Sequence, residues 1–112
     1  MKDFKFQGRI YYNAMELTNS YIGGTWKMPV LLALRQKALR YTVLKKNVAH
    51  ISDKMLYIVL RDLEKKGMIG RKVFAEKPPR VEYQLTALGK KSIKVIDTLQ
   101  RFGIHLMRIN GL

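Results

Sequence analysis

The sequence predicts one mainly α-helical domain with a small β-hairpin, and three observations support this. A length of 112 residues suits a single domain with one modest core. Apolar residues recur at helical spacing on both sides of an expected turn at 48–51. Farther along, two segments of alternating polarity flank a tip at 77–80 that contains two adjacent prolines. Two helices joined by a turn and followed by a hairpin form a winged helix-turn-helix, and we expect one such domain over 1–112.

The chain should begin with a basic, aromatic lead-in over 1–12, followed by two helices. Asn13 can cap a helix over 14–22, because the oxygen of a short polar side chain accepts a hydrogen bond from the first free backbone amides. Thr25 can cap a second helix over about 26–37 in the same way. Two adjacent glycines between these segments end the first helix.

The helix-turn-helix is expected at about 41–66. A short helix over 41–47 leads into the turn, and Ser52 then caps a longer helix that ends at Lys66, just before a glycine. The longer helix carries an apolar stripe at helical spacing, which should face the core. The stripe consists of Leu56, Val59, Leu60 and Leu63.

The opposite face of this longer helix combines charge with aromatic and aliphatic surface. Tyr57 and Ile58 together are unusual on a surface that meets only water. Thymine methyl groups and sugar edges in the major groove of DNA offer apolar contacts, so a face that meets DNA would explain both residues. The alternative is that Tyr57 and Ile58 pack against the preceding helix or the hairpin. The complete face is Lys54, Tyr57, Ile58 and Arg61.

The hairpin, or wing, is expected at about 71–86, and the last helix at about 87–108. The apolar stripe of the last helix continues toward the C-terminus, farther than one small core can cover. A second copy related by two-fold symmetry is the simplest cover, so we expect a homodimer through the terminal helices. The residues expected at this contact are Tyr12, Met15, Val95, Leu99, Phe102 and Leu106.

The charge of the chain predicts a polyanionic partner. It carries 22 lysines and arginines against 8 acidic residues, a formal net charge of +14. Residues 35–80 hold 13 of the basic residues and only four of the acids. For each single basic residue the alternative is an ordinary solvated charge. We expect phosphate contacts from Arg40, Lys45, Lys46, Lys54, Lys77 and Arg80, and base contacts from Ser52, Tyr57, Ile58 and Arg61. Arg80, at the wing tip, also suits a narrow minor groove.

Other classes of function lack the residues that they require. The chain contains no cysteine, which excludes disulfides, thiol chemistry and cysteine-ligated zinc. Its two histidines, His50 and His105, are far apart in sequence, and neither has a carboxylate at metal-ligand spacing. No catalytic constellation is recognisable, so we expect no enzymatic activity, no metal and no cofactor. No apolar run has the length of a signal peptide or a membrane span, which makes the cytoplasm the expected compartment.

Four segments resemble the HxlR family of bacterial and archaeal winged helix-turn-helix transcription regulators. They are IGGTWK at 22–27, YTVL at 41–44, LRDLEKKGMI at 60–69 and PPRVEYQLTALG at 78–89. Their order and spacing match the family over about 13–103. The resemblance implies a homodimer that binds double-stranded operator DNA, dimerises through its terminal helices and uses the helix after Ser52 for recognition. A two-fold dimer in turn implies an inverted-repeat operator.

The chain also departs from the pattern of the family. Asn13 and Ala14 stand where many members have Cys-Pro, so the thiol-based sensing of those members is not carried over. Any effector would then be a small molecule in an apolar pocket of the dimer or a partner protein, or there is no effector. Asp53 replaces a frequent proline at the start of the recognition helix, and Val43 stands where an acidic residue is common.

Two alternative classes of function are compatible with a small basic domain. An RNA- or ribosome-associated domain would expose aromatic rings on a sheet or form a basic groove for a single strand. A winged-helix module that binds another protein would not need the basic charge concentrated over 35–80. Binding of duplex DNA, single-stranded DNA and RNA in parallel distinguishes these classes.

Overall fold

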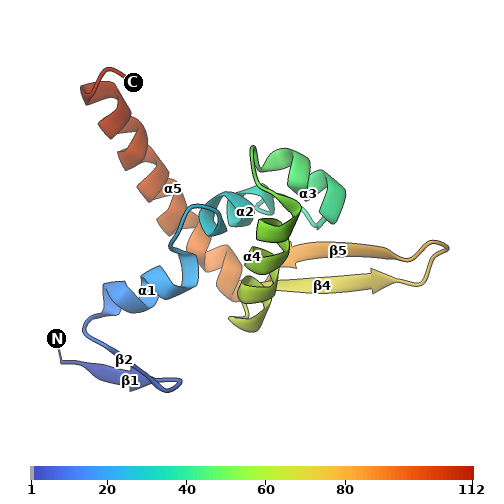
Figure 1. Cartoon of the computed structure of the whole chain (residues 1–112), viewed down its shortest axis with the longest axis horizontal. Helices are drawn as coiled ribbons and strands as arrows, with labels where there is room; N and C mark the ends of the chain where they lie inside the picture. The colour runs from blue at the N-terminus through green and yellow to red at the C-terminus, as the bar shows by residue number, and fades with distance from the viewer. Residues whose placement is uncertain (1) are drawn as a thin grey trace.

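The computed structural model describes residues 2–112, which form five helices and two small antiparallel sheets (Figure 1). The arrangement is the predicted winged helix-turn-helix, in which α3 and α4 flank the turn and β4 and β5 form the wing. The helices are α1 (Ala14–Ile22), α2 (Lys27–Ala33), α3 (Tyr41–Asn47), α4 (Asp53–Lys65) and α5 (Ala87–Ile109).

The larger sheet contains the wing and one additional short strand. β4 (Ile69–Phe74) and β5 (Arg80–Leu85) pair along their full lengths, and β3 (Leu39–Arg40) pairs with the other edge of β5. The smaller sheet is a separate hairpin of β1 (Phe4–Phe6) and β2 (Arg9–Tyr11) ahead of α1.

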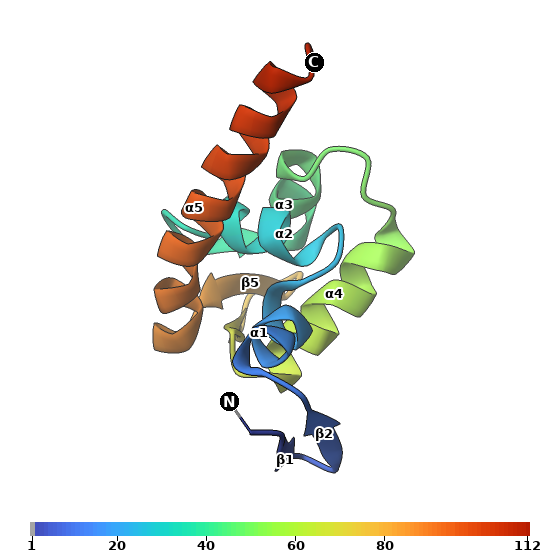
Figure 2. The ribbon, with the colours of Figure 1, turned by 90° about the vertical axis from the view of Figure 1, so that its left-hand side faces the viewer.

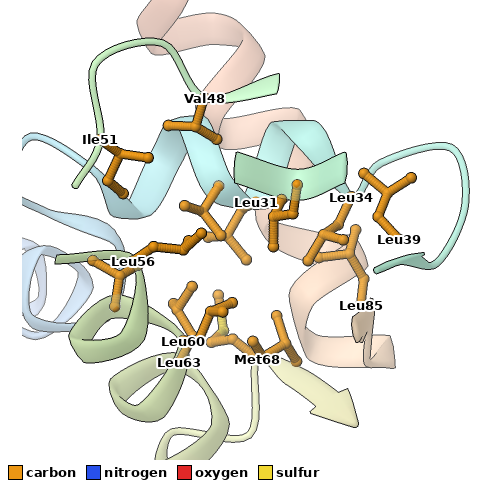
Figure 3. Packing of buried hydrophobic residues seen from close by; sticks show 14 of the residues in the cluster. Leu31, Leu34, Leu39, Val48, Ile51, Leu56, Leu60, Leu63, Met68 and Leu85 are labelled. Atoms are coloured by element: carbon orange, nitrogen blue, oxygen red, sulfur yellow. The ribbon is translucent and has the colours of Figure 1, made fainter. Parts of the chain in front are cut away.

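One apolar core joins the helices to the base of the wing. Leu31 of α2, Leu44 of α3 and Leu56 and Leu63 of α4 are inaccessible to solvent, and Ile96 of α5 is 1 % exposed. Figure 3 shows Leu31 across the core from Leu63, with Leu85 of the wing near Leu34. The apolar stripe that the sequence predicts on α4 is therefore buried as expected.

Two of the predicted helix caps form, and one does not. The side chains of Asn13 and Ser52 accept hydrogen bonds from the amides of the residues three positions on, at 2.8 and 3.1 Å. Thr25 caps nothing, because α2 starts one residue later, after Trp26, which makes no side-chain cap bond. At the start of the last helix, the Thr86 side chain also acts as a cap and accepts from the Gly89 amide at 3.1 Å.

Several predicted boundaries are wrong. The helix expected over 26–37 ends at Ala33, because Leu39 and Arg40 pair with β5 and the chain must turn before them. Within residues 1–12, the lead-in contains the hairpin β1–β2, which three-residue strands make hard to detect by alternation. The first wing strand starts at Ile69, two residues before the expected position.

The wing and the free half of α5 project from the core in opposite directions (Figure 1). Figure 2 shows that α5 extends well beyond the other helices before the chain ends. The predicted stripe on α5 is open to solvent there, and Phe102 is 60 % exposed. The wing and this stripe therefore form two separate surfaces.

The start of α5 packs against the beginning of the wing without room for a side chain. The Thr86 hydroxyl donates to the Gly67 carbonyl at 2.6 Å, and the Thr86 amide donates to the Met68 carbonyl at 3.1 Å. A Cβ at Gly89 would overlap the carbonyl oxygen of Met68. Gly89 is therefore required by a close backbone approach.

We expect Gly89→Ala to lower the free energy of unfolding by about 1–3 kcal/mol, the usual cost of overpacking a tight contact. Urea unfolding followed by circular dichroism measures this. Gly70→Ala in β4 is the matched control, because a Cβ there has no neighbour within 4 Å. Equal unfolding midpoints for the two variants would contradict the close approach.

Candidate nucleic-acid interface

α4 exposes the face opposite its buried stripe. Successive side chains turn by about 100° around a helix, so burying Leu56 and Leu63 directs Tyr57, Ile58 and Arg61 outward. Tyr57 is 59 % exposed and Ile58 is 47 % exposed. At this exposure, neither side chain is buried against α3 or the wing.

Two residues of this face hold each other in place. An Arg61 nitrogen donates to the Tyr57 hydroxyl at 3.2 Å, and the guanidinium carbon lies 5.7 Å from the centre of the Tyr57 ring. These contacts between positions i and i+4 limit the rotamers of both side chains. The face therefore places a phenol and a guanidinium side by side on the surface.

α3 borders two adjoining hollows in the surface. One, of about 590 Å³, lies between α3 and the start of α4, and Lys45, Lys46 and Asp53 line it. The second, of about 420 Å³, lies between the start of α3 and the wing tip. Its lining includes Arg40, Lys77 and Arg80, and Tyr41 and Thr42 line both hollows. The structure therefore brings the predicted phosphate-binding residues of α3 and the wing together on one surface.

Most of the predicted phosphate-binding and base-binding cations are free to meet an anion. Of these predicted cations, five are exposed and take part in no ion pair within residues 2–112, and Lys45 is paired with Asp53. An unpaired surface cation can bind a phosphate without first breaking an ion pair. The five are Arg40, Lys46, Lys54, Arg61 and Lys77.

Arg80 differs from these residues because the wing itself holds its guanidinium. It lies 3.2 Å from Glu76 and 3.4 Å from Glu82, and it stacks on the Phe74 ring at 3.9 Å. Only 26 % of its side chain is exposed. In this conformation Arg80 braces the wing tip, and a minor-groove contact would require it to leave two carboxylates.

An acidic residue stands at the first turn of α4. The Tyr41 hydroxyl donates to Asp53 Oδ1 at 2.8 Å, and Lys45 Nζ lies 3.1 Å from the same oxygen. The hydrogen bond from Tyr41, with the help of Lys45, holds the pKa of Asp53 below its ordinary value of 3.8. Burial and the same hydrogen bond raise the pKa of the Tyr41 hydroxyl. The carboxylate is therefore ionised and fixed at the mouth of a basic hollow.

Behind the exposed face, an ion-pair cluster fixes α4 against α2. Asp62 Oδ2 lies 2.7 Å from Lys27 Nζ and 2.8 Å from Lys66 Nζ. Burial acts to raise the pKa of Asp62, but hydrogen bonds from the two lysines outweigh it and lower the pKa. The cluster helps to set the direction in which α4 presents its outer face.

The interface also contains three residues that the sequence did not predict there, Tyr41, Thr42 and Asp53. Tyr41 and Thr42 line both hollows, and Asp53 lies between the basic side chains. Their positions follow from the angle between α3 and α4, which periodicity in the sequence does not define. The left-handed backbone of His50, at φ 69°, is part of the turn that sets this angle.

A further hollow, mainly apolar, lies between α1 and α5. Its volume is about 310 Å³, and its lining includes Tyr21, Met68, Leu88 and Val95. This is the lower end of the range in which small ligands bind. The hollow adjoins the exposed stripe of α5 at Val95, and the prediction of a small-molecule effector stays a prediction.

A comparison with known families and sequences gives consistent results. A model of the HxlR-like helix-turn-helix family matches residues 21–109. An HTH-type transcriptional regulator of Methanothermobacter thermautotrophicus is 41 % identical over 93 residues, which cover 83 % of this chain and 71 % of the relative. The HTH-type transcriptional regulator YtcD of Bacillus subtilis is 37 % identical over 102 residues, which cover 90 % of this chain and 81 % of YtcD.

Solved structures share the same architecture. The structure of a transcriptional regulator named ytcD superposes with a TM-score of 0.79 at 35 % identity, over 86 % of this chain and 98 % of that one. The redox regulator HypR in its oxidised form has a TM-score of 0.78 at 29 % identity, over 83 % of this chain and 96 % of HypR.

The fold and the exposed face of α4 define a winged helix-turn-helix protein. The chain belongs to the HxlR-like helix-turn-helix family, so it is a transcriptional regulator for which DNA binding is implied. Members of this family are regulators and not enzymes. Among the helices within residues 2–112, none is long and apolar enough to cross a membrane.

We expect the Asp53 carboxyl group to titrate below 3.8, and Tyr41→Phe to move its midpoint upward. The folded-state pKa lies below the unfolded value, so the stabilisation is complete at neutral pH and is lost as the pH falls through the lowered pKa. NMR titration of the side-chain carboxyl carbon measures both midpoints. An Asp53 midpoint that is the same in both proteins would contradict the Tyr41 hydrogen bond.

Proposed function

We propose that the protein is a sequence-specific regulator that binds duplex DNA as a homodimer on an inverted-repeat operator. The observation that carries this proposal is the outer face of α4, where Tyr57, Ile58 and Arg61 are exposed beside an uncompensated basic surface. A helix of this width fits the major groove, and its outward side chains can reach base edges.

The contacts divide by chemistry. Arg61 can donate two hydrogen bonds to guanine, while Tyr57 and Ile58 provide apolar surface for thymine methyl groups. Ser52 already accepts a bond from the amide of Met55, and its place at the N-terminus of α4 is where recognition helices approach base edges. Phosphate contacts fix the register and come from the surrounding cations, which are Arg40, Lys45, Lys46, Lys54, Lys77 and Arg80.

The homodimer would use the free half of α5 together with α1. Val95, Leu99 and Leu106 are between 41 and 47 % exposed, and Phe102 is more exposed still. Tyr12 and Met15, which are 66 and 75 % exposed, extend the same kind of surface to the start of α1. Exposure of this much apolar surface to water is unfavourable, and contact with a second copy would bury it.

The alternative of a domain that binds single-stranded RNA has less support, because the aromatic rings of the two sheets are not open for stacking. Phe74 in the wing is covered by Arg80 at 3.9 Å and approached by Lys72 at 5.1 Å, so its face is not open to a base. Tyr11 of the N-terminal hairpin is 6 % exposed and stacks on Phe4. Neither sheet, within residues 2–112, presents an open row of aromatic rings for stacking.

We expect tight duplex binding that weakens steeply with salt. If a dimer neutralises on the order of 6–10 phosphates, affinity should fall about 10³–10⁵-fold between 50 and 200 mM salt. The selected sites should be inverted repeats with half-site centres about one helical turn apart. Gel shifts with duplex DNA, single-stranded DNA and RNA, and selection from a random duplex library, measure this. Equal binding to every duplex would refute sequence-specific recognition.

Arg61→Ala and Arg80→Ala should have different effects on DNA binding, the first mainly on sequence preference and the second mainly on general affinity. Loss of Arg61 should cost about 1–3 kcal/mol on the preferred site and relax the preference at one base pair. Loss of Arg80, which the wing holds with two carboxylates, should weaken binding to all sequences more evenly. Binding profiles over a randomised operator separate the two. An unchanged profile for Arg61→Ala would remove Arg61 from the base-reading set.

Phe102→Asp should produce monomers, because it places a charge inside the apolar contact of the dimer. Arg101→Gln is the matched control. It changes the net charge by the same amount on the same helix, but its side chain projects about 100° away from Phe102. Analytical ultracentrifugation reports the mass, and circular dichroism reports the fold. A folded Phe102→Asp dimer with full operator affinity would show that the dimer contact lies elsewhere.

A further inference from the structure

An acidic side chain stands where the interface otherwise collects positive charge. Asp53 occupies the first position of α4, and 71 % of its side chain is exposed. The hollow that it lines also contains Lys45 and Lys46. A carboxylate in this position repels phosphate groups, so it weakens general attraction to DNA. Asp53 also stabilises the positive N-terminal end of α4, and the geometry of its carboxylate allows a second role.

The structure fixes one oxygen of this carboxylate and leaves the other open. The Tyr41 hydroxyl and Lys45 Nζ both contact Oδ1, at 2.8 and 3.1 Å. No hydrogen bond within residues 2–112 reaches Oδ2. Two contacts on one oxygen hold the plane of the carboxylate, and the second oxygen keeps its lone pairs for a partner. Asp53 is therefore a preorganised acceptor at the entrance of the recognition helix.

The chemistry of the major groove restricts what such an acceptor can bind. Only the N4 amino group of cytosine and the N6 amino group of adenine donate hydrogen bonds there. Adenine places its N7 acceptor beside N6, and this lone pair would repel a carboxylate. Cytosine has no acceptor of its own next to N4 on that edge. A fixed carboxylate therefore favours cytosine over the other three bases.

We propose that Asp53 selects a C·G base pair in each half-site by accepting a hydrogen bond from the cytosine amino group through Oδ2. Tyr41 and Lys45 are the positioning residues, because they hold Oδ1. This proposal rests on the proposed function. It adds one residue that reads a base, names that base, and states whether the residue strengthens or weakens non-specific binding. Asp53 lowers affinity for phosphates and raises discrimination between sequences.

The test is selection from a random duplex library by the full-length protein, followed by affinity measurements with each of the four base pairs at each position. Wild-type protein should prefer C·G at one position of each half-site by about 5–150-fold over the other pairs, the fold-change that corresponds to about 1–3 kcal/mol. Asp53→Ala should remove this preference and keep the preferences at all other positions. Asp53→Asn should shift the same position toward adenine, because an amide pairs with adenine N6 and N7.

Two further variants separate base reading from general charge. Asp3→Ala removes the same negative charge from the N-terminal segment and should leave the whole profile unchanged. Tyr41→Phe keeps the ring, frees Oδ1 from one of its two contacts and should reduce the C·G preference without abolishing it. A merely structural role for Tyr41 would change affinity for every sequence by the same factor.

The outcomes distinguish this proposal from the function on which it rests. If wild-type protein prefers no sequence at all, the proposed function fails, and the role of Asp53 fails with it. If wild-type protein is specific but Asp53→Ala and Asp53→Asn retain its profile, only the role of Asp53 is overturned. An equal gain in affinity for all sequences in Asp53→Ala would show that Asp53 acts through its charge alone.

Discussion

The burial of one face of α4 is the constraint on which the rest of the structure depends. Leu56, Leu60 and Leu63 pack into the core against α2, and the Lys27–Asp62 ion pair holds the same two helices together. Because a helix is rigid, fixing its inner face also fixes the direction of its outer face. Tyr57 and Arg61 are exposed for that reason. The orientation of this outer face is therefore a consequence of apolar packing, and a change in the core would change it.

The distribution of ion pairs determines where the positive charge remains available. Within residues 2–112, seven of the eight acidic residues take part in ion pairs, mostly away from the outer face of α4. Seven basic residues are used in these pairs, which leaves most of the 22 uncompensated. The acids thus support the fold, as Asp62 does between α2 and α4, or brace the wing, as Glu76 and Glu82 do. The net charge of +14 therefore produces a positive electrostatic potential around the protein.

The two projecting elements, the wing and the free half of α5, present different kinds of surface. The wing is braced by Arg80 and Phe74 and continues the basic surface from α3. The free half of α5 carries exposed apolar residues, among them Phe102 and Ile109. Gly89 and Thr86 join the two at the point where α5 meets the base of the wing.

The sequence by itself determined the order of elements, the caps at Asn13 and Ser52, the buried stripe of α4 and the family, because these depend on local spacing and composition. Only the tertiary structure decided the features that depend on residues distant in sequence. The early end of α2 follows from the pairing of Leu39 with β5, and the bracing of Arg80 follows from the register of the wing. The fixed carboxylate of Asp53 requires α3 and α4 to meet at one angle, so that Tyr41 and Lys45 reach the same oxygen. Periodicity along a chain describes single elements, whereas the angle between two elements is set by the packing of side chains between them.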